Sequence, residues 1–181
     1  MAAVVSEAEE VAAGFPAEEA VSAGGATAAA GERPTMRHRK FVSALVHERI
    51  HAAIHAAEMK SSGEIRVMIS HKPAPDPVAT AQRAFLQLGM QQTRHRNAVL
   101  IFVAPRSRTF AVIGDEAMHA KCGDEFWREL AGTMAGHFKR GEFTEGLLHG
   151  IDRAGELLAA HFPHEPDDRN ELPDDVIEDS P

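Results

Sequence analysis

The strongest constraint on the fold is the run NAVLIFVA, residues 97–104, in which seven apolar residues follow Asn97 without interruption. Val99, Ile101 and Val103 are β-branched, and such residues favour strands. An apolar run of this length is typical of a central strand that is covered on both faces. The chain is therefore expected to build a sheet between two layers of other structure.

Two further strands are predicted beside this run. EIRVMIS, residues 64–70, alternates so that Ile65, Val67 and Ile69 share one face. TFAVIG, residues 109–114, follows the turn PRSR and is expected to pair back on the central run as a hairpin.

The helical spacing of apolar residues predicts helices over residues 36–60, 77–90, 124–139 and 143–161, with a short helical turn after Gly114. The apolar stripe of the first helix is expected to consist of Val42, Val46, Ile50, Ala53 and Ala57. The element order is α-β-α-β-β-α-α. Because a helix joins the first two strands they should be parallel, and the third strand should be antiparallel to the second. The expected fold class is α/β, a three-layer α/β/α sandwich with a small mixed sheet.

The two ends of the chain differ from the middle in composition. Residues 1–34 are rich in Ala, Gly and Glu and are expected to form a disordered extension. Residues 35–163 form the predicted domain. Residues 164–181 form an acidic, proline-punctuated tail, which is expected to be extended and to contact the domain through Leu172, Val176 and Ile177.

Composition excludes several classes of function. A net charge of −8 and a pI near 5.7 argue against a protein that neutralises nucleic-acid phosphates. The single cysteine, Cys122, forms no CxxC metal pair and favours a reducing compartment. No uncharged apolar run reaches the roughly 18 residues that a membrane helix needs. The expectation is a soluble, cytoplasmic protein without membrane insertion.

The predicted topology gathers polar residues at one edge of the sheet. The parallel strands begin there with Glu64 and Asn97, and the antiparallel strand ends there, just before Asp115. The expected neighbours are Glu64, Arg96, Asn97, Asp115, Glu116 and His119. Carboxylate and amide oxygens suit a hard cation such as Ca²⁺ or Mg²⁺, and the predicted ligands are Glu64, Asn97, Asp115 and Glu116.

A structural interpretation competes with this one. Asp115 is a suitable N-cap for the turn that follows it, and Asp124, entered through Gly123, is a suitable N-cap for the next helix. Glu64 is then a solvated first residue of its strand. Capping alone does not explain why Glu64 and Asn97 are placed at the same edge.

Two other motifs suggest chemistry. HERIH, residues 47–51, matches the HExxH pattern of zinc peptidases, with Glu48 as general base. His55 lies too far along a straight helix to be the third ligand, and no motif marks the downstream Glu or His that could serve instead. A polar flank of the helix is the alternative. Cys122 near His119 suggests a nucleophile and base, but a buried thiol that packs as a small hydrophobe is the alternative.

The motifs SSGEIRV, LGM, RNAVLIFVA, FAVIGDEAMH, DEFW, GEFTEGLLHGI and DDRNELPDDV follow one another as in the TPM-domain family. The chain resembles the short, soluble bacterial branch of that family over about residues 36–178. The resemblance implies an α/β/α sandwich, a divalent-cation site and, by analogy with the plant member, acid-phosphatase activity. The positions that carry over are Glu64, Asn97 and Asp115, while Ala98 stands where the family usually has glycine.

Three functions remain open. The first is a cation-binding module that assists or regulates protein partners without turnover. The second is a metal-dependent phosphomonoesterase at the same edge, in which Arg96 binds the phosphate and His119 acts as acid beside Asp115. The third is a zinc peptidase on His47, Glu48 and His51.

Overall fold

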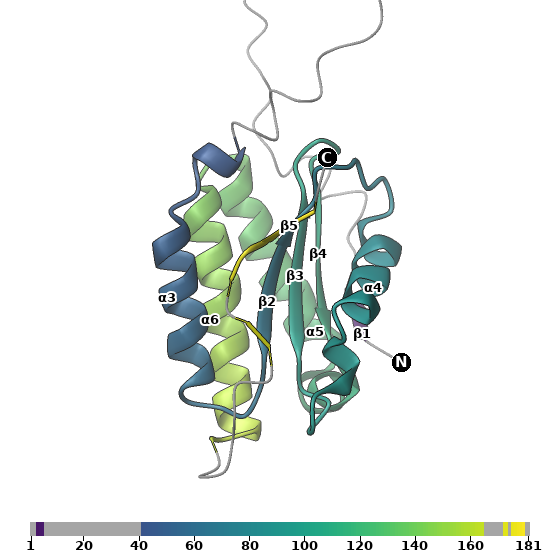
Figure 1. Ribbon diagram of the computed structural model, residues 1–181, viewed down its shortest axis with the longest axis vertical. Helices are drawn as coiled ribbons and strands as arrows, with labels where there is room; N and C mark the ends of the chain where they lie inside the picture. Colours follow the sequence, from purple (N-terminus) through teal and green to yellow (C-terminus); the bar gives the residue numbers. More distant parts are fainter. Residues whose placement is uncertain (1–2, 6–40, 165–171, 174, 180–181) are drawn as a thin grey trace, which may run out of the picture.

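The computed structural model describes residues 3–5, 41–164, 172–173 and 175–179. It is an α/β sandwich around a five-stranded mixed sheet of order β1-β4-β3-β2-β5 (Figure 1). The strands are β1 (Ala3–Val5), β2 (Ile65–Ile69), β3 (Val99–Ala104), β4 (Thr109–Gly114) and β5 (Ile177–Glu178). The helices are α3 (His47–Glu58), α4 (Pro77–Gln87), the short 3₁₀ helix η1 (Met90–Gln92), α5 (Glu116–Lys139) and α6 (Phe143–His161). The α/β class and the layers agree with the prediction.

Strand β3 lies in the middle of the sheet, and all six of its residues are buried. Alternate side chains enter two separate cores. Val99, Ile101 and Val103 pack in the core under α3, α5 and α6, whereas Leu100 and Phe102 pack in the core under α4. The run is therefore uninterrupted because β3 is covered on both faces, as predicted. As predicted, β2 is parallel to β3 and β4 is antiparallel to it.

The first predicted helix is wrong in one respect, because it is interrupted before His47. Residues 41–43 are helical, residues 44–46 are not continuous with them, and α3 begins only afterwards. Thr144 explains the interruption: its hydroxyl accepts a hydrogen bond from Val46 N at 3.1 Å and donates to Ala44 O at 3.3 Å. Val46 is 45% exposed and so does not belong to the buried stripe.

The buried stripe of α3 consists of Ile50, Ile54 and Ala57. Ile54 takes the place that the prediction gave to Ala53, which is only half-buried. The stripe faces α6, where Gly155 leaves no room for a side chain: an added Cβ would lie 2.7 Å from the Cβ of Ala57. Small residues at this contact allow the two helices to pack closely.

The predicted turn and helix after Asp115 join into α5, with a kink at Gly123. Gly123 has φ 68°, in the left-handed region that favours glycine. The boundary between the predicted turn and the helix at 124–139 lies at this kink. Gly141, with φ 75°, follows the end of α5, and the hydroxyl of Thr144 at the start of α6 contacts the backbone of residues 44 and 46.

Both outer strands come from segments near the chain ends. Most of the predicted extension over residues 1–34 lies outside the described residues, but Ala3–Val5 pair antiparallel with β4. In the acidic tail, Ile177 and Glu178 pair parallel with Met68 and Ile69 of β2. Val176 packs against the core under α3, α5 and α6, and Leu172 packs against the other core, so these contacts of the tail are as predicted. Within the described part of the chain, no helix has the length and hydropathy needed to cross a membrane.

Candidate cation site at the sheet edge

The strand register brings the predicted residues to one end of the sheet. Ile65 pairs with Val99, and Val99 pairs with Gly114. One step further toward the edge, Val99 N donates to Glu64 O at 2.8 Å, and Asp115 N donates to Ala98 O at 2.9 Å. Glu64, Asn97 and Asp115 thus lie at the ends of three adjacent strands although they are far apart in sequence.

Asp115 is the N-cap of α5. Its φ and ψ of −70° and 170° are extended, and its Oδ1 accepts a hydrogen bond from Glu116 N at 2.7 Å. The residue is only 1% exposed. A buried carboxylate needs compensation for the solvation that it loses, and the cap supplies only part of that compensation.

Arg96 supplies the rest. Its Nε donates to Asp115 Oδ2 at 2.9 Å and its Nη2 donates to Asp115 Oδ1 at 3.3 Å. The hydrogen bond to Asp115, followed by the charge of that carboxylate, raises the pKa of Arg96. Arg96 also adopts φ 53°, a left-handed conformation that is unusual for a residue other than glycine. Its carbonyl accepts from Ala117 N at 3.3 Å, which ties the strained turn to the start of α5.

Asn97 is fully buried, and its amide is only half satisfied. Nδ2 donates to Ser62 O at 3.0 Å and lies 3.4 Å from Ser62 Oγ, which fixes the loop before β2. Among the described residues, Oδ1 has no hydrogen-bond donor. Glu64 is 4% exposed, so it is not the solvated strand residue of the alternative interpretation. Buried carboxylates and a buried amide oxygen at the ends of adjacent strands are ligand types that a hard cation prefers.

The last two predicted neighbours lie differently. Glu116 is exposed in the first turn of α5. His119 Nε2 lies 3.5 Å from Asp124 Oδ1, across the kink at Gly123. Within the described ranges, no group of three or more His, Cys, Asp or Glu side chains could hold a metal ion. A cation at this edge would therefore depend on the amide oxygen of Asn97 in addition to the carboxylates.

The HERIH segment forms the first turn of α3 and borders a groove. His47, Glu48 and His51 are exposed and line a groove of about 580 Å³ together with Asp175 and Val176 of the tail. His47 Nε2 is 3.9 Å from Glu178 Oε1. The segment is a polar flank of its helix, as in the alternative interpretation, and its neighbours in the groove come from the chain's own tail.

Cys122 is half-buried and packs against the core under α3, α5 and α6. Burial, more than any charge, raises the pKa of its thiol to about 11, and its Sγ donates to Met118 O at 3.2 Å. The thiol is therefore protonated at neutral pH and is unsuited to nucleophilic attack. This agrees with the reading of Cys122 as a small hydrophobe.

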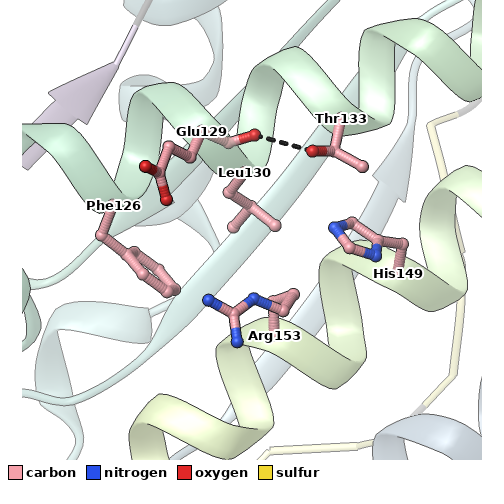
Figure 2. Close-up of a pocket in the computed structure, with 6 residues that line it drawn as sticks. All are labelled: Phe126, Glu129, Leu130, Thr133, His149 and Arg153. Atoms are coloured by element: carbon pink, nitrogen blue, oxygen red, sulfur yellow. Dashed lines mark hydrogen bonds between the residues drawn. The ribbon is translucent and has the colours of Figure 1, made fainter.

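The sequence analysis missed a pocket of about 110 Å³ between α5 and α6 (Figure 2). Trp127 lies in the core, whereas the adjacent Phe126 is only half-buried and lines this pocket. The remaining lining residues are Glu129, Leu130, Thr133, His149 and Arg153. The guanidinium carbon of Arg153 lies 5.7 Å from the centre of the Phe126 ring. Spacing along one helix cannot reveal a pocket whose walls come from two helices.

Comparisons with known proteins agree with this fold. A family model described as the TPM domain matches residues 36–157. Among solved structures, the chain is similar to the NMR structure of the BA42 protein from the psychrophilic bacterium Bizionia argentinensis. The two share 37% sequence identity over 74% of this chain and 92% of that chain, with a TM-score of 0.68. No curated protein matches the chain.

Proposed function

We propose that this chain, which belongs to the TPM-domain family, is a cytoplasmic module that binds a divalent cation, Ca²⁺ or Mg²⁺, and acts through a protein partner. The observation that carries the proposal is the side-chain oxygen of Asn97, which is buried and lacks a hydrogen-bond donor among the described residues. Leaving such an acceptor unsatisfied costs roughly 1–3 kcal/mol. A cation that binds the oxygen would recover this energy.

The proposed ligands are Asn97, Glu64 and Asp115, with Glu116 at the exposed side of the site. Two buried carboxylates provide the charge, and the amide oxygen provides a neutral ligand. When bound, the cation would neutralise these acids and link the starts of β2 and β3 to the start of α5. It would thereby order the surface that a partner contacts.

Arg96 is the expected competitor of the cation. Its guanidinium satisfies Asp115 in the structure, but its side chain is 46% exposed and can leave without opening the core. The cation and the guanidinium would then use the same carboxylate oxygens in turn. Removing Arg96 should therefore strengthen cation binding, whereas a purely structural pair would give no such gain.

Phosphomonoester hydrolysis is less well supported by the same contacts. The roles predicted for Arg96 and His119 would require both to leave their present partners, Asp115 and Asp124. A p-nitrophenyl phosphate assay on the cation-loaded chain and on Asp115→Asn tests this function. Hydrolysis that disappears in the variant would favour the phosphatase.

The test is a titration of the full chain with CaCl₂, and then with MgCl₂, followed by NMR and calorimetry. Saturable shifts are expected at the amides of Glu64, Asn97 and Asp115 and at the side-chain amide of Asn97. Asp115→Asn should weaken binding about tenfold or more, which corresponds to about 1.4 kcal/mol. Arg96→Gln should strengthen binding.

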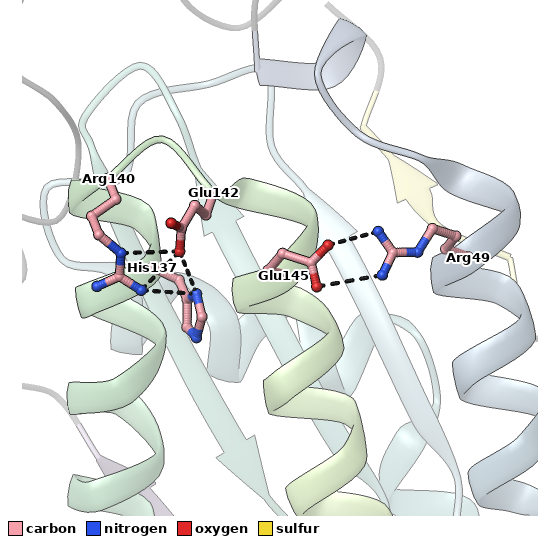
Figure 3. A network of polar contacts seen from close by, with 5 residues as sticks. All are labelled: Arg49, His137, Arg140, Glu142 and Glu145. Carbon is pink, nitrogen blue, oxygen red and sulfur yellow. Dashed lines mark hydrogen bonds and ion pairs between the residues drawn. The ribbon is translucent and has the colours of Figure 1, made fainter.

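The matched control is Arg49→Gln. Arg49 also forms a paired contact with a carboxylate, with Nη1 2.6 Å and Nη2 3.4 Å from the two carboxyl oxygens of Glu145, but this pair joins α3 to α6 on the surface (Figure 3). Its removal should leave cation affinity unchanged. Site amides that do not move with either cation would contradict the proposal.

A further inference from the structure

The chain's own tail lies in a groove that has the features of a peptide-binding site. One wall is the first turn of α3, where His47 and His51 lie, and beside it β5 pairs with the outer edge of β2. The tail enters with Asp175 and Val176 and pairs with β2 through Ile177 and Glu178. Addition of a strand to a sheet edge is a common mode of peptide recognition.

The aliphatic residues of the tail provide the apolar part of this contact. Val176 packs against the core under α3, α5 and α6, and both Val176 and Ile177 are half-buried. Ile177 pairs with Met68 in the parallel ladder. Backbone pairing gives affinity in this mode, and pockets for alternate side chains give specificity.

Two carboxylates end the docked segment, and each meets specific partners. Asp179 Oδ2 accepts from Ser70 Oγ at 2.8 Å, and Asp179 Oδ1 accepts from His71 N. Glu178 lies between two imidazoles, 3.4 Å from His71 Nε2 and 3.9 Å from His47 Nε2. The end of β2 and the start of α3 thus recognise two successive acids.

The pairing between the chain's own tail and β2 is short. β5 pairs with two of the five residues of β2, and the groove of about 580 Å³ stays open beside Val176. A segment bound from another molecule could place further side chains in this space. A tethered segment needs only weak contacts to stay bound, because its effective concentration is about millimolar.

We infer that the groove between the β2 edge and α3 is a receptor for an extended segment of another protein, in which two aliphatic residues precede two carboxylates. The chain's own Val176–Ile177–Glu178–Asp179 has this chemistry and competes with the partner in cis. This inference does not depend on cation binding. The HERIH residues His47 and His51 serve as the wall of the groove.

The experiment uses a fluorescent peptide with the sequence of residues 171–181, added to the full chain. Asp179→Ala removes the contacts with Ser70 and His71 from the tail and leaves the groove intact. Because the internal competitor is weakened, the variant should bind the peptide at least about tenfold more tightly than the unmodified chain. Fluorescence anisotropy measures the two affinities.

Two controls separate recognition from general charge attraction. A scrambled peptide of the same composition should bind neither protein. Adding Ser70→Ala to Asp179→Ala should abolish the gain, because it removes a partner of the peptide's own aspartate. Equal binding of the scrambled peptide, or a gain that survives Ser70→Ala, would overturn the inference.

Release of the tail is measured separately, from hydrogen exchange at the amides of Ile177 and Glu178. If Asp179→Ala leaves them protected, Ile177→Ser is added to complete the release. A released tail with no gain in peptide affinity would overturn the inference. So would a dimer of the unmodified chain held by exchanged tails, detected by light scattering, because the occupant would then be a second copy.

Discussion

At the scale of single residues, Asp115 combines a structural contact with capacity for a ligand. A carboxylate offers about four acceptor sites, two on each oxygen. Oδ1 accepts from Glu116 N and from Arg96 Nη2, and Oδ2 accepts from Arg96 Nε. The cap alone uses one of these sites, so departure of Arg96 would leave about three for a cation, and the cap and the proposed cation site are compatible.

The residues of the edge could be predicted from topology, but their pairing could not. Glu64, Asn97 and Asp115 follow from where three strands begin and end. The contact between Arg96 and Asp115 depends on a left-handed backbone at Arg96, and nothing in the residue type signals that conformation. The amide contact of Asn97 with Ser62 is likewise set by a loop whose course the spacing does not determine.

Cys122 should react slowly with alkylating reagents. Because burial raises the pKa of its thiol to about 11, the thiolate is scarce at pH 8, and modification should be on the order of one hundredfold slower than for a free thiol. Mass spectrometry after iodoacetamide treatment measures the rate. The urea-unfolded chain should react at the ordinary rate, and equal rates before and after unfolding would contradict the prediction.

At the scale of elements, the break before α3 shows a tertiary contact overriding helical periodicity. The spacing of Val42, Val46 and Ile50 fits a continuous helix. Thr144, which lies nearly 100 residues later, instead bonds to the backbone of Ala44 and Val46. Periodicity within a segment carries no information about such a partner, which is why the length of this helix was wrong while the helices after it were predicted closely.

Thr144→Val should destabilise the fold by about 0.5–1.5 kcal/mol. Valine keeps the shape of the side chain but removes the hydroxyl, so Val46 N loses its acceptor and Ala44 O loses a donor at a partly buried contact. Urea unfolding measures the free energy of unfolding.

Thr133→Val is the matched control for this substitution. Within the described segments, the hydroxyl of Thr133 bonds only to Glu129 O of its own helix in an exposed position, so the change should stay within about 0.5 kcal/mol. An equal decrease in the free energy of unfolding in both variants would show that the contact of Thr144 with residues 44 and 46 contributes nothing beyond an ordinary helix hydroxyl.

At the scale of the whole molecule, the three layers could be predicted from the apolar sequence of a single strand, β3. β3 is buried on both faces, and this alone requires cover on each side. The two outer strands were not predicted as strands, because segments of two and three residues are too short to show a period of two. The pocket between α5 and α6 was missed because its walls come from separate helices.

His149 should make the stability of the whole fold depend on pH. Burial, followed by repulsion from His137 and Arg153, lowers the pKa of His149 from the ordinary value of 6.5. The unfolded chain then binds more protons than the folded chain as the pH falls below 6.5, so the free energy of unfolding should decrease in that direction.

Unfolding by urea between pH 7.5 and pH 5 tests this dependence. His149→Asn should give a shallower decline than the unmodified chain, because asparagine does not titrate. Arg153→Gln should give an intermediate slope, since it removes one of the repelling charges. Curves that run parallel in all three proteins would contradict the assignment to His149.

The order β1-β4-β3-β2-β5 places segments from near the two chain ends at the two outer edges of the sheet. An open edge is a template on which neighbouring molecules can add strands. Here the short strands β1 and β5 cover the outer edges of β4 and β2. Proteolytic trimming at either end would therefore do more than shorten the chain: it would expose a surface from which the sheet could grow by polymerisation.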